Sequence, residues 1–356
     1  MARGKQQQEI IERATKEVQA SFDLSKFKTK KGFGAENAKY KTQAWIPVSK
    51  AWQNATSLPG IPQGQITVLR GHTNTGKTTT LIECAASCQK MGILPVLIIT
   101  EAKFSWEFCK QLGFEYTETV DKATGEVNGV EGFFLYADRG SLKTIEDVAA
   151  FIMDILNEQE KGNLPYDLCF LWDSIGSVPC RMSVEAKNIN AQWDAAALSN
   201  NFAKFINQRI VLSRKALSPY TNTLVCTSKI WVSPPDSPMG SPKVNSKGGT
   251  AIPYDAALIV FYGNITNPGV TKIKAAANGK TYEWGNRTKV GIEKNHLCGL
   301  GSAGYLVMTP TGFIDPDQKS IDKYRAEHQS EWIEYLGSQD FEVIEEEVPY
   351  TVDYEE

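Results

Sequence analysis

Residues 71–78 constrain this chain more than any other segment. They read Gly-His-Thr-Asn-Thr-Gly-Lys-Thr, which has the spacing of a phosphate-binding loop, G-x-x-x-x-G-K-[ST]. The two glycines let the backbone bend so that successive N–H groups face phosphate oxygens. Such a loop needs a strand before it and a helix after it. The apolar run 66–69 and the Gly- and Pro-free run 79–91 meet that need, so the loop predicts an α/β fold with a nucleotide site.

The residue types within the loop suggest the role of each position. Lys77 is expected to reach the β- and γ-phosphates, and the Thr78 hydroxyl is expected to ligate Mg²⁺. Gly92 stands where a helix C-cap would end the following helix. The residues expected to bind the nucleotide are Gly71, His72, Thr73, Asn74, Thr75, Gly76, Lys77, Thr78 and Thr79.

Length and composition narrow the class of protein. The 356 residues allow one large α/β domain with small appendages, and no apolar run reaches the ~20 residues that span a bilayer. The polar N-terminus lacks a signal-peptide core, so we expect a cytoplasmic protein. The seven cysteines include no CxxC pair, and Cys84, Cys169 and Cys226 lie in apolar surroundings. Buried, reduced thiols are therefore expected rather than metal ligands or disulfides.

The net charge of −3 hides an asymmetry along the chain. No Lys or Arg follows Arg325, and the chain ends in an acidic stretch that we expect to be solvated and mobile over residues 340–356. The overall balance argues against bulk nonspecific attraction to nucleic acid, although local basic loops can still bind phosphate. A basic patch near the N-terminus consists of Lys26, Lys28, Lys30, Lys31, Lys39 and Lys41.

The N-terminal part, residues 1–44, predicts a lone helix followed by a linker. Within 6–22, an apolar side chain recurs every fourth residue, which is typical of an amphipathic helix. Residues 26–41 are polar and charged and read as a linker. The apolar stripe of the helix needs a cover, which either the chain's own core or a neighbouring copy of the protein could supply.

Residues 45–295 alternate strand-like and helix-like segments, the pattern of a mostly parallel sheet with covering helices. Antiparallel strands are expected at 272–275, 280–284 and 288–293, with turns at Asn278-Gly279 and Gly285-Asn286. Residues 297–356 are expected to form a small separate module. The other expected strands are 66–69, 95–100, 132–136, 168–172, 223–227 and 257–261, and the expected helices are 79–91, 106–112, 143–160 and 194–216.

Two acidic residues follow apolar strands. Asp173 comes after the apolar run 168–172, an arrangement that delivers a carboxylate to the Mg²⁺ side of a phosphate site, although an ordinary strand followed by an Asp turn gives the same pattern. Glu101 follows the run 95–100 in the same way. An acid there could activate water for γ-phosphate hydrolysis, or it could be a helix N-terminal acid favoured by the dipole.

Two segments are expected to be loops at the ligand end of the sheet. Residues 231–249 carry four prolines and three glycines, which exclude regular structure, so the segment should be functional or disordered. Its Lys243 and Lys247 could meet phosphates. The second loop, 179–193, follows Asp173 and carries Arg181, Met182 and Lys187.

Taken in order, these segments resemble the RecA-type homologous recombinases, including bacteriophage recombinases such as UvsX. The similarity runs collinearly over about residues 45–296. The segments that carry it are Gly64-Gln65-Ile66 leading into the phosphate loop, Thr100-Glu101-Ala102, Tyr136-Ala137-Asp138-Arg139-Gly140, Leu171–Pro179 around Asp173, and Gly248–Ala256.

The resemblance implies a RecA-like P-loop ATPase core at 45–296, an N-terminal oligomerisation helix within 1–44 and a small C-terminal module at 297–356. It implies ATP and Mg²⁺ as cofactors, with Glu101, Lys77 and Lys229 as catalytic residues and Thr78 and Asp173 as metal ligands. ATP would lie between protomers of a helical homo-oligomer. Asp138 and Arg139 would line the adenine side, and Lys294 and His296 would reach the neighbour's γ-phosphate.

The resemblance also implies partners. Single-stranded and double-stranded DNA would bind the two loops, and single-strand-binding and loader proteins could assist. The implied DNA-binding residues are Arg181, Met182, Lys187, Trp231, Lys243, Lys247, Gly248 and Gly249.

Two residues depart from the bacterial members of the family. Lys229 stands where they carry a glutamine that senses the γ-phosphate, and a lysine would sense it as a point charge. His296 replaces a lysine, so one charge toward the neighbour can be absent at neutral pH.

The sequence therefore predicts an ATP-dependent recombinase that forms filaments on single-stranded DNA and promotes strand exchange. Two rivals stay open at this point: a hexameric helicase or related motor, and an ATP-gated regulatory or structural filament without strand exchange. Fold alone does not choose among them.

Overall fold

The computed structural model describes residues 39–122, 124–188, 190–233, 243–246, 251–264, 269–299 and 301–348. The helix expected at 6–22, most of the basic patch and the end of the acidic tail lie outside these residues. The elements below belong to one compact unit, residues 43–214 and 218–356. In the other unit, the described stretches 39–42 and 215–217 are joined by a hydrogen bond from the Ala216 N–H to the Lys39 carbonyl (2.9 Å).

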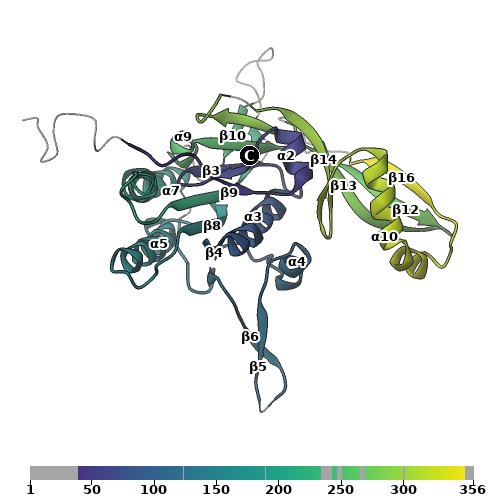
Figure 1. Ribbon diagram of the computed structural model, residues 1–356, viewed down its shortest axis with the longest axis horizontal. Helices are drawn as coiled ribbons and strands as arrows, with labels where there is room; N and C mark the ends of the chain where they lie inside the picture. Colours follow the sequence, from purple (N-terminus) through teal and green to yellow (C-terminus); the bar gives the residue numbers. More distant parts are fainter. Residues whose placement is uncertain are drawn as a thin grey trace, which may run out of the picture. The chain divides into compact units, whose positions relative to one another are not determined.

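A central sheet organises the compact unit (Figure 1). Its strands lie in the order β15-β14-β13-β11-β3-β9-β8-β4-β7, and the stretch from β11 to β7 is parallel throughout. The parallel strands are β3 (Ile66–Gly71), β4 (Leu94–Ile99), β7 (Leu135–Asp138), β8 (Leu168–Ile175), β9 (Asn222–Ser233) and β11 (Leu258–Tyr262). The antiparallel strands are β13 (Lys280–Asn295), β14 (Ala303–Thr309) and β15 (Gly312–Ile314).

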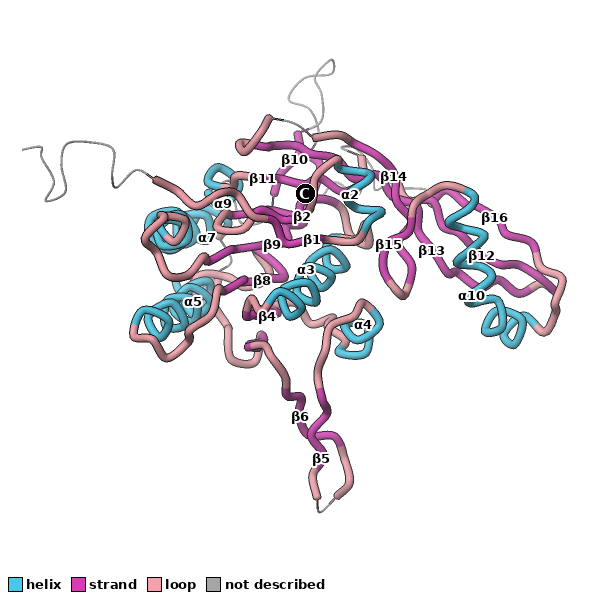
Figure 2. Tube along the Cα trace, viewed as in Figure 1, coloured by secondary structure: helices cyan, strands magenta, loops and turns pink. Residues whose placement is uncertain are grey.

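Helices cover both faces of the parallel strands, so these strands are apolar on both sides (Figure 2). All eight residues of β8 are buried. One face packs against α2 (Lys50–Thr56), α3 (Lys77–Met91) and α4 (Trp106–Gln111). The other face packs against α5 (Ile145–Glu160), α7 (Ala191–Leu198), the π-helical η2 (Ser199–Ile206), α8 (Asn207–Leu212) and α9 (Ala251–Asp255).

Shorter elements complete the unit. Strands β1 (Trp45–Pro47) and β2 (Gly60–Pro62) pair with each other, as do β5 (Thr117–Val120) and β6 (Val127–Glu131). Helix α6 (Arg181–Glu185) follows β8, and β10 (Lys243–Ser246) pairs with the end of β9. No helix within the described ranges is both long and apolar enough to cross a bilayer.

The α/β architecture with a mostly parallel sheet is confirmed, and most expected elements lie within a few residues of their observed positions. Gly92 ends α3 with φ +71°, and its N–H donates to the Gln89 carbonyl (3.2 Å). Thr144 begins α5 with a capping box. The turn at Asn278-Gly279 is also present, because β12 (Thr271–Ala277) and β13 flank it.

Three expectations about local structure were wrong. No turn occurs at Gly285-Asn286, because β13 continues and absorbs the extra residue as a bulge at Trp284, whose ring is buried. The helix expected at 194–216 begins at Ala191 and ends at Leu212, with a π-helical stretch in its middle. The two loops are partly regular, since 231–249 includes the ends of the β9–β10 pair and 179–193 includes α6.

The C-terminal residues build a second layer on β13. Strand β13 pairs with β12, which in turn pairs with β16 (Glu342–Glu347), and α10 (Gln318–Leu336) packs on these strands. Their shared core contains Trp284, Tyr324 and Trp332, with the ring centroids of the two tryptophans 5.0 Å apart. The expected boundary at 296/297 falls between β13 and β14, which pair in the central sheet.

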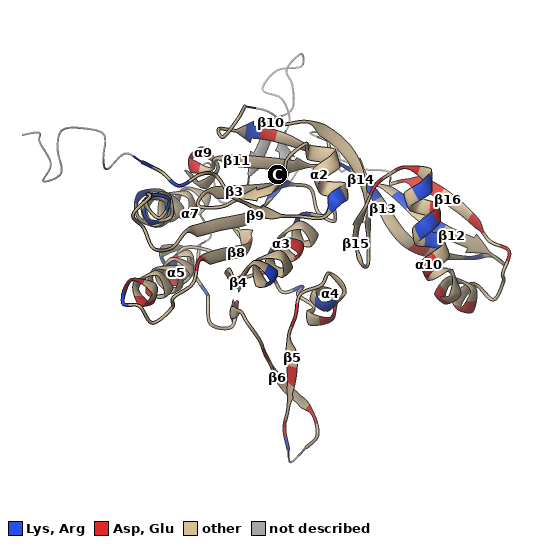
Figure 3. Cartoon of the chain, in the orientation of Figure 1, with Lys and Arg blue, Asp and Glu red and all other residues tan. Residues whose placement is uncertain are grey.

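Part of the acidic C-terminal stretch is a strand, so the expectation of a mobile tail is wrong at residues 342–347, although most of these residues are exposed as expected. Residues 342–347 form β16, and charged partners on neighbouring strands stabilise it (Figure 3). Glu345 pairs with Arg287 (2.6 Å), and Glu346 pairs with Lys274. These long-range ion pairs offset the mutual repulsion of the carboxylates.

Candidate nucleotide-binding site

The phosphate-loop sequence forms the strand–loop–helix unit that it predicts. Strand β3 ends at Gly71, and α3 begins at Lys77. Gly71 has φ +152°, and a Cβ there would lie 2.2 Å from the Tyr262 carbonyl oxygen. Gly76 has φ +100°, and a Cβ would lie 2.8 Å from the Phe313 ring. Both positions therefore require glycine.

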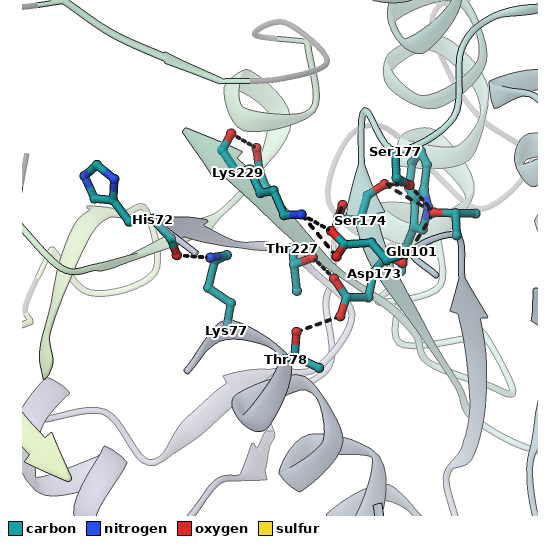
Figure 4. Close-up of polar contacts among 12 residues, drawn as sticks. His72, Lys77, Thr78, Glu101, Asp173, Ser174, Ser177, Thr227 and Lys229 are labelled. Atoms are coloured by element: carbon teal, nitrogen blue, oxygen red, sulfur yellow. Dashed lines mark hydrogen bonds and ion pairs between the residues drawn. The ribbon is translucent and has the colours of Figure 1, made fainter. Parts of the chain in front are cut away.

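The Lys77 ammonium is buried and is held by the loop itself. It donates a hydrogen bond to the His72 carbonyl, which also accepts from the Thr75 hydroxyl (2.8 Å) (Figure 4). Burial lowers the pKa of Lys77 to about 8, although the nearby Asp173 carboxylate acts in the opposite direction. The lysine is thus a poorly solvated cation for which an anionic partner would be favourable.

Two loop side chains face the protein rather than the cavity. The His72 ring nitrogen contacts the Asn264 carbonyl (3.1 Å) and lies away from the carboxylates in Figure 4. The Thr79 hydroxyl contacts the Met308 sulfur (3.4 Å). These two residues can offer their backbone to a ligand, whereas Thr73, Asn74, Lys77 and Thr78 line the cavity.

Asp173 and Thr78 lie within hydrogen-bonding distance of each other. The Thr78 hydroxyl donates to Asp173 Oδ2 (2.7 Å), and the Thr227 hydroxyl donates to Asp173 Oδ1. Burial raises the pKa of Asp173, and the two hydroxyl donors offset part of that rise. A hydroxyl beside a carboxylate is the donor set that Mg²⁺ uses at phosphate sites.

Glu101 lies in the same cavity as this pair. Its Oε1 accepts from the Ser174 hydroxyl (2.5 Å), and its carboxylate oxygens lie 3.1 and 3.2 Å from Lys229 Nζ. Burial acts to raise the pKa of Glu101, but the hydrogen bonds from Ser174 and Lys229 outweigh it and lower the pKa. Glu101 is not a helix N-terminal acid, because α4 begins at Trp106 with Ser105 as its cap.

The strand order brings these residues together. Strands β3, β9, β8 and β4 are neighbours, and Gly71 at the end of β3 lies opposite Lys229 on β9. The carboxyl ends of neighbouring parallel strands meet at one edge, where α/β proteins bind ligands. One cavity of about 710 Å³ is lined by Thr73, Asn74, Lys77, Thr78, Glu101, Arg139, Asp173, Ser174 and Lys229, among others.

The sequence did not single out Ser174 or Thr227, although both contact the predicted acids. Ser174 follows Asp173 directly, and its backbone carbonyl accepts from the Ser177 hydroxyl (2.7 Å). Trp172 supports the same turn, because its Nε1 donates to the Thr100 hydroxyl (3.0 Å). The position of Ser174 next to a strand-end acid was the available signal, whereas only the strand order places Thr227.

Three expected nucleotide contacts outside the phosphate loop do not line this cavity. The Asp138 carboxylate accepts from the Gly140 N–H (2.9 Å) and closes its own turn. The Lys294 ammonium donates to the Tyr254 carbonyl (2.6 Å), and the His296 N–H donates to the Ala257 carbonyl (2.9 Å). Burial lowers the pKa of Lys294. A role of these last two residues toward a neighbouring protomer stays a prediction.

The expected DNA contacts lie on several elements. In α6, the Met182 side chain is exposed, and Arg181 pairs with Asp147 (3.4 Å) while remaining largely exposed. Lys187 follows with φ +51°. The backbones of Trp231 and Lys243 belong to the β9–β10 pair. Lys247, Gly248 and Gly249 lie outside the described residues.

The three cysteines that were expected to be buried are buried. Cys84, Cys169 and Cys226 are each 0 % exposed. The sulfurs of Cys84, Cys88 and Cys169 lie within 4.8 Å of one another in the core behind the phosphate loop.

Comparison with known proteins agrees with this fold. Residues 9–130 match the model of the RecA N-terminal domain. Over this part of its length the chain is similar to the RecA family. Protein RecA of Chlorobaculum tepidum is 24% identical over 268 residues, covering 74% of this chain and 65% of that protein. Protein RecA of Streptococcus gordonii is 24% identical over 304 residues, covering 83% of this chain and 66% of that protein.

A shorter alignment has higher identity. Protein RecA of Ureaplasma parvum serovar 3 is 37% identical over 73 residues, which cover 20% of this chain and 22% of that protein. In these three comparisons the chain thus covers less than two thirds of each relative's length. The comparisons show similarity to RecA proteins, and the activity is a matter for proposal.

Proposed function

We propose that this chain is an ATP-dependent DNA recombinase. It would assemble into helical filaments on single-stranded DNA in the cytoplasm of a bacterial or phage-infected cell, and would promote homologous pairing and strand exchange. The observation that carries the proposal is the single cavity shared by Lys77, the Thr78–Asp173 pair and Glu101. These groups match the parts that phosphoryl transfer requires: a phosphate cation, metal ligands and an acid that orients water.

The residues of the cavity fit MgATP. The Thr78 hydroxyl and the Asp173 carboxylate, 2.7 Å apart, would hold Mg²⁺. When it is bound, Mg²⁺ neutralises part of the negative charge of the phosphates. The Lys77 ammonium donates to the His72 carbonyl, and Lys77 would exchange that contact for the β- and γ-phosphates. Arg139 would lie against the outer part of the nucleotide.

Glu101 would act as the base that orients and deprotonates the attacking water. The lowered pKa of Glu101 keeps the carboxylate ionised near neutral pH, and the Ser174 hydroxyl fixes its direction. Lys229 would sense the γ-phosphate as a point charge, because its ammonium can exchange Glu101 for phosphate oxygens. Glu101, Lys77 and Lys229 are therefore the proposed catalytic residues.

The same proposal assigns a role to each part of the chain. Residues 1–44 would contact the adjacent protomer, 45–296 would hold ATP and DNA, and 297–356 would form the C-terminal module. Lys294 and His296 would approach the neighbour's nucleotide. Exposed Arg181 and Met182, with Lys187 and the 231–249 segment, would contact the DNA backbone and bases.

A combined assembly and strand-exchange assay tests the proposal. Wild-type protein with a non-hydrolysable ATP analogue and single-stranded DNA should form filaments in electron micrographs, and with ATP it should form joint molecules with a homologous duplex. Lys77→Ala should abolish DNA-stimulated ATP turnover and filament extension. Rings in place of filaments would favour a motor, and DNA binding without joint molecules would favour a regulatory filament.

A further inference from the structure

The β5–β6 hairpin is a part of the fold that the proposed activity does not use. Its strands pair with each other and with no other strand in the described ranges. Figures 1 and 2 show it extending away from the central sheet, and in the chain it lies between α4 and β7. Val120 and Val127 are direct cross-strand partners, 52% and 56% exposed. An isolated two-stranded hairpin is marginally stable in water, so a cover over these valines would stabilise it.

The hairpin is also strongly acidic (Figure 3). Residues 115–131 carry five carboxylates and a single lysine, Lys122. Such a surface repels phosphate, so nucleic acid and anionic nucleotide are poor partners for it. It fits a basic polypeptide that also carries apolar side chains. The five carboxylates belong to Glu115, Glu118, Asp121, Glu126 and Glu131.

The attachment points of the hairpin place it beside the nucleotide cavity. The hairpin joins α4 to β7, the edge strand of the central sheet. Phe108 of α4 and Arg139, which follows β7, both line the cavity. Under the proposed function, which this step assumes, the nucleotide lies between protomers. The hairpin therefore stands at the side of the molecule where the next copy would approach.

We propose that the acidic hairpin 115–131 docks on the basic segment 26–41 of the adjacent copy of this chain. That segment carries six lysines and one glutamate, so its charge complements that of the hairpin. It also carries Phe27 and Phe33, apolar side chains suited to cover Val120 and Val127. It directly follows the N-terminal stretch proposed as the protomer contact. The hairpin would thus form a second contact between adjacent copies, in addition to the N-terminal stretch.

A charge-swap experiment tests the pairing. In the hairpin variant, three exposed glutamates of residues 115–131 are replaced by lysine. In the segment variant, three lysines of residues 26–41 are replaced by glutamate. A third protein combines both sets. A matched control reverses three exposed acids of α10, giving the same change in net charge as the hairpin variant. The substitutions are Glu118→Lys, Glu126→Lys and Glu131→Lys; Lys26→Glu, Lys28→Glu and Lys30→Glu; and, for the control, Glu327→Lys, Glu331→Lys and Glu334→Lys.

Assembly with ATP analogue and single-stranded DNA is followed by light scattering at low salt. Each single set should raise the protein concentration at half-assembly about tenfold, equivalent to ~1.4 kcal/mol. The combined protein should return to within about threefold of wild type, and the control should match wild type. The defect should shrink as salt rises, because exposed charges are screened. A hairpin variant that assembles like wild type, or a combined protein that is not rescued, would overturn the pairing.

Zero-length carbodiimide cross-linking tests the same contact without relying on substitutions. Filaments are assembled from equal amounts of isotopically light and heavy wild-type protein. Mixed-label cross-links between 115–131 and 26–41 are expected. If only same-label cross-links form, the contact lies within one chain. If no cross-links form between the two segments, the hairpin does not bind this segment and another basic partner is indicated. Either result refutes the proposal. Wild-type protein that does not assemble at all would refute the filament proposal itself, before any variant is compared.

Discussion

Removing the Ser174 hydroxyl should slow ATP hydrolysis without weakening nucleotide binding. This hydroxyl donates to Glu101 Oε1 at 2.5 Å, the short distance of a bond to an ionised oxygen. A hydrogen bond to a charged group contributes ~1.5–3 kcal/mol. The Glu101 side chain is 22% exposed, so water can replace part of the lost bond, and the lower end of that range applies. Ser174→Ala should therefore reduce turnover about tenfold, since ~1.4 kcal/mol corresponds to one power of ten.

The pH dependence of the variant gives an independent readout. The hydrogen bond lowers the pKa of Glu101, so its removal should raise that pKa. Glu101 acts as a base only when it is ionised. Activity in the variant should therefore be lost at a higher pH than in wild type as the solution is acidified, by roughly one pH unit for ~1.4 kcal/mol.

Ser177→Ala is the matched control. The Ser177 hydroxyl donates to the Ser174 carbonyl (2.7 Å) and has no hydrogen bond to Glu101 among those of the described residues. Steady-state DNA-stimulated phosphate release, with nucleotide affinity measured by fluorescence, compares the two variants. Wild-type turnover in Ser174→Ala, or an equal loss in Ser177→Ala, would refute the role assigned to Ser174.

Further changes should separate the other parts of the proposal. Glu101→Gln should still bind nucleotide but hydrolyse it far more slowly, so filaments should persist longer after free ATP is removed; failure to bind nucleotide would make Glu101 structural. Deleting residues 1–25 should leave a folded, ATP-binding monomer, and unchanged light scattering would contradict this. Glu345→Gln with Glu346→Gln should free two cations on β12 and β13 and tighten duplex DNA binding at low salt. Equal affinities of this variant and wild type at low salt would count against that competition.

The main parts of the site could be predicted because they are local in sequence. Lys77 and Thr78 follow one strand, Glu101 follows another, and Asp173 lies near the end of a third, so a motif and the rule for strand ends suffice. Thr227 was missed because its contact with Asp173 depends on the pairing of β8 with β9, which the sequence does not state. Lys229 was found only through the family resemblance.

The wrong expectations arose where distant residues decide the local structure. Gly285 suggested a turn, but β12 and β14 pair on both sides of β13 and keep it extended. The prolines of 231–249 lie between β9 and β10, so they did not prevent the two ends of the segment from pairing. The run of glutamates in β16 predicted a mobile tail because like charges repel one another. Its cationic partners, Lys274 and Arg287, lie about 60 to 70 residues earlier in the chain, so nothing in the local sequence indicated these ion pairs.

Strand β13 makes the central sheet and the C-terminal layer mechanically continuous. Its first half pairs with β12, its second half with β11, and β14 lies along its other edge. Lys294, proposed to face a neighbour's nucleotide, lies near its end, 10 residues beyond Trp284 in the C-terminal core. A twist of the outer layer must therefore bend one hydrogen-bonded ribbon that carries this lysine. Amide hydrogen exchange along β13 should consequently slow at both halves together when filaments form, because neither half can open without fraying the other.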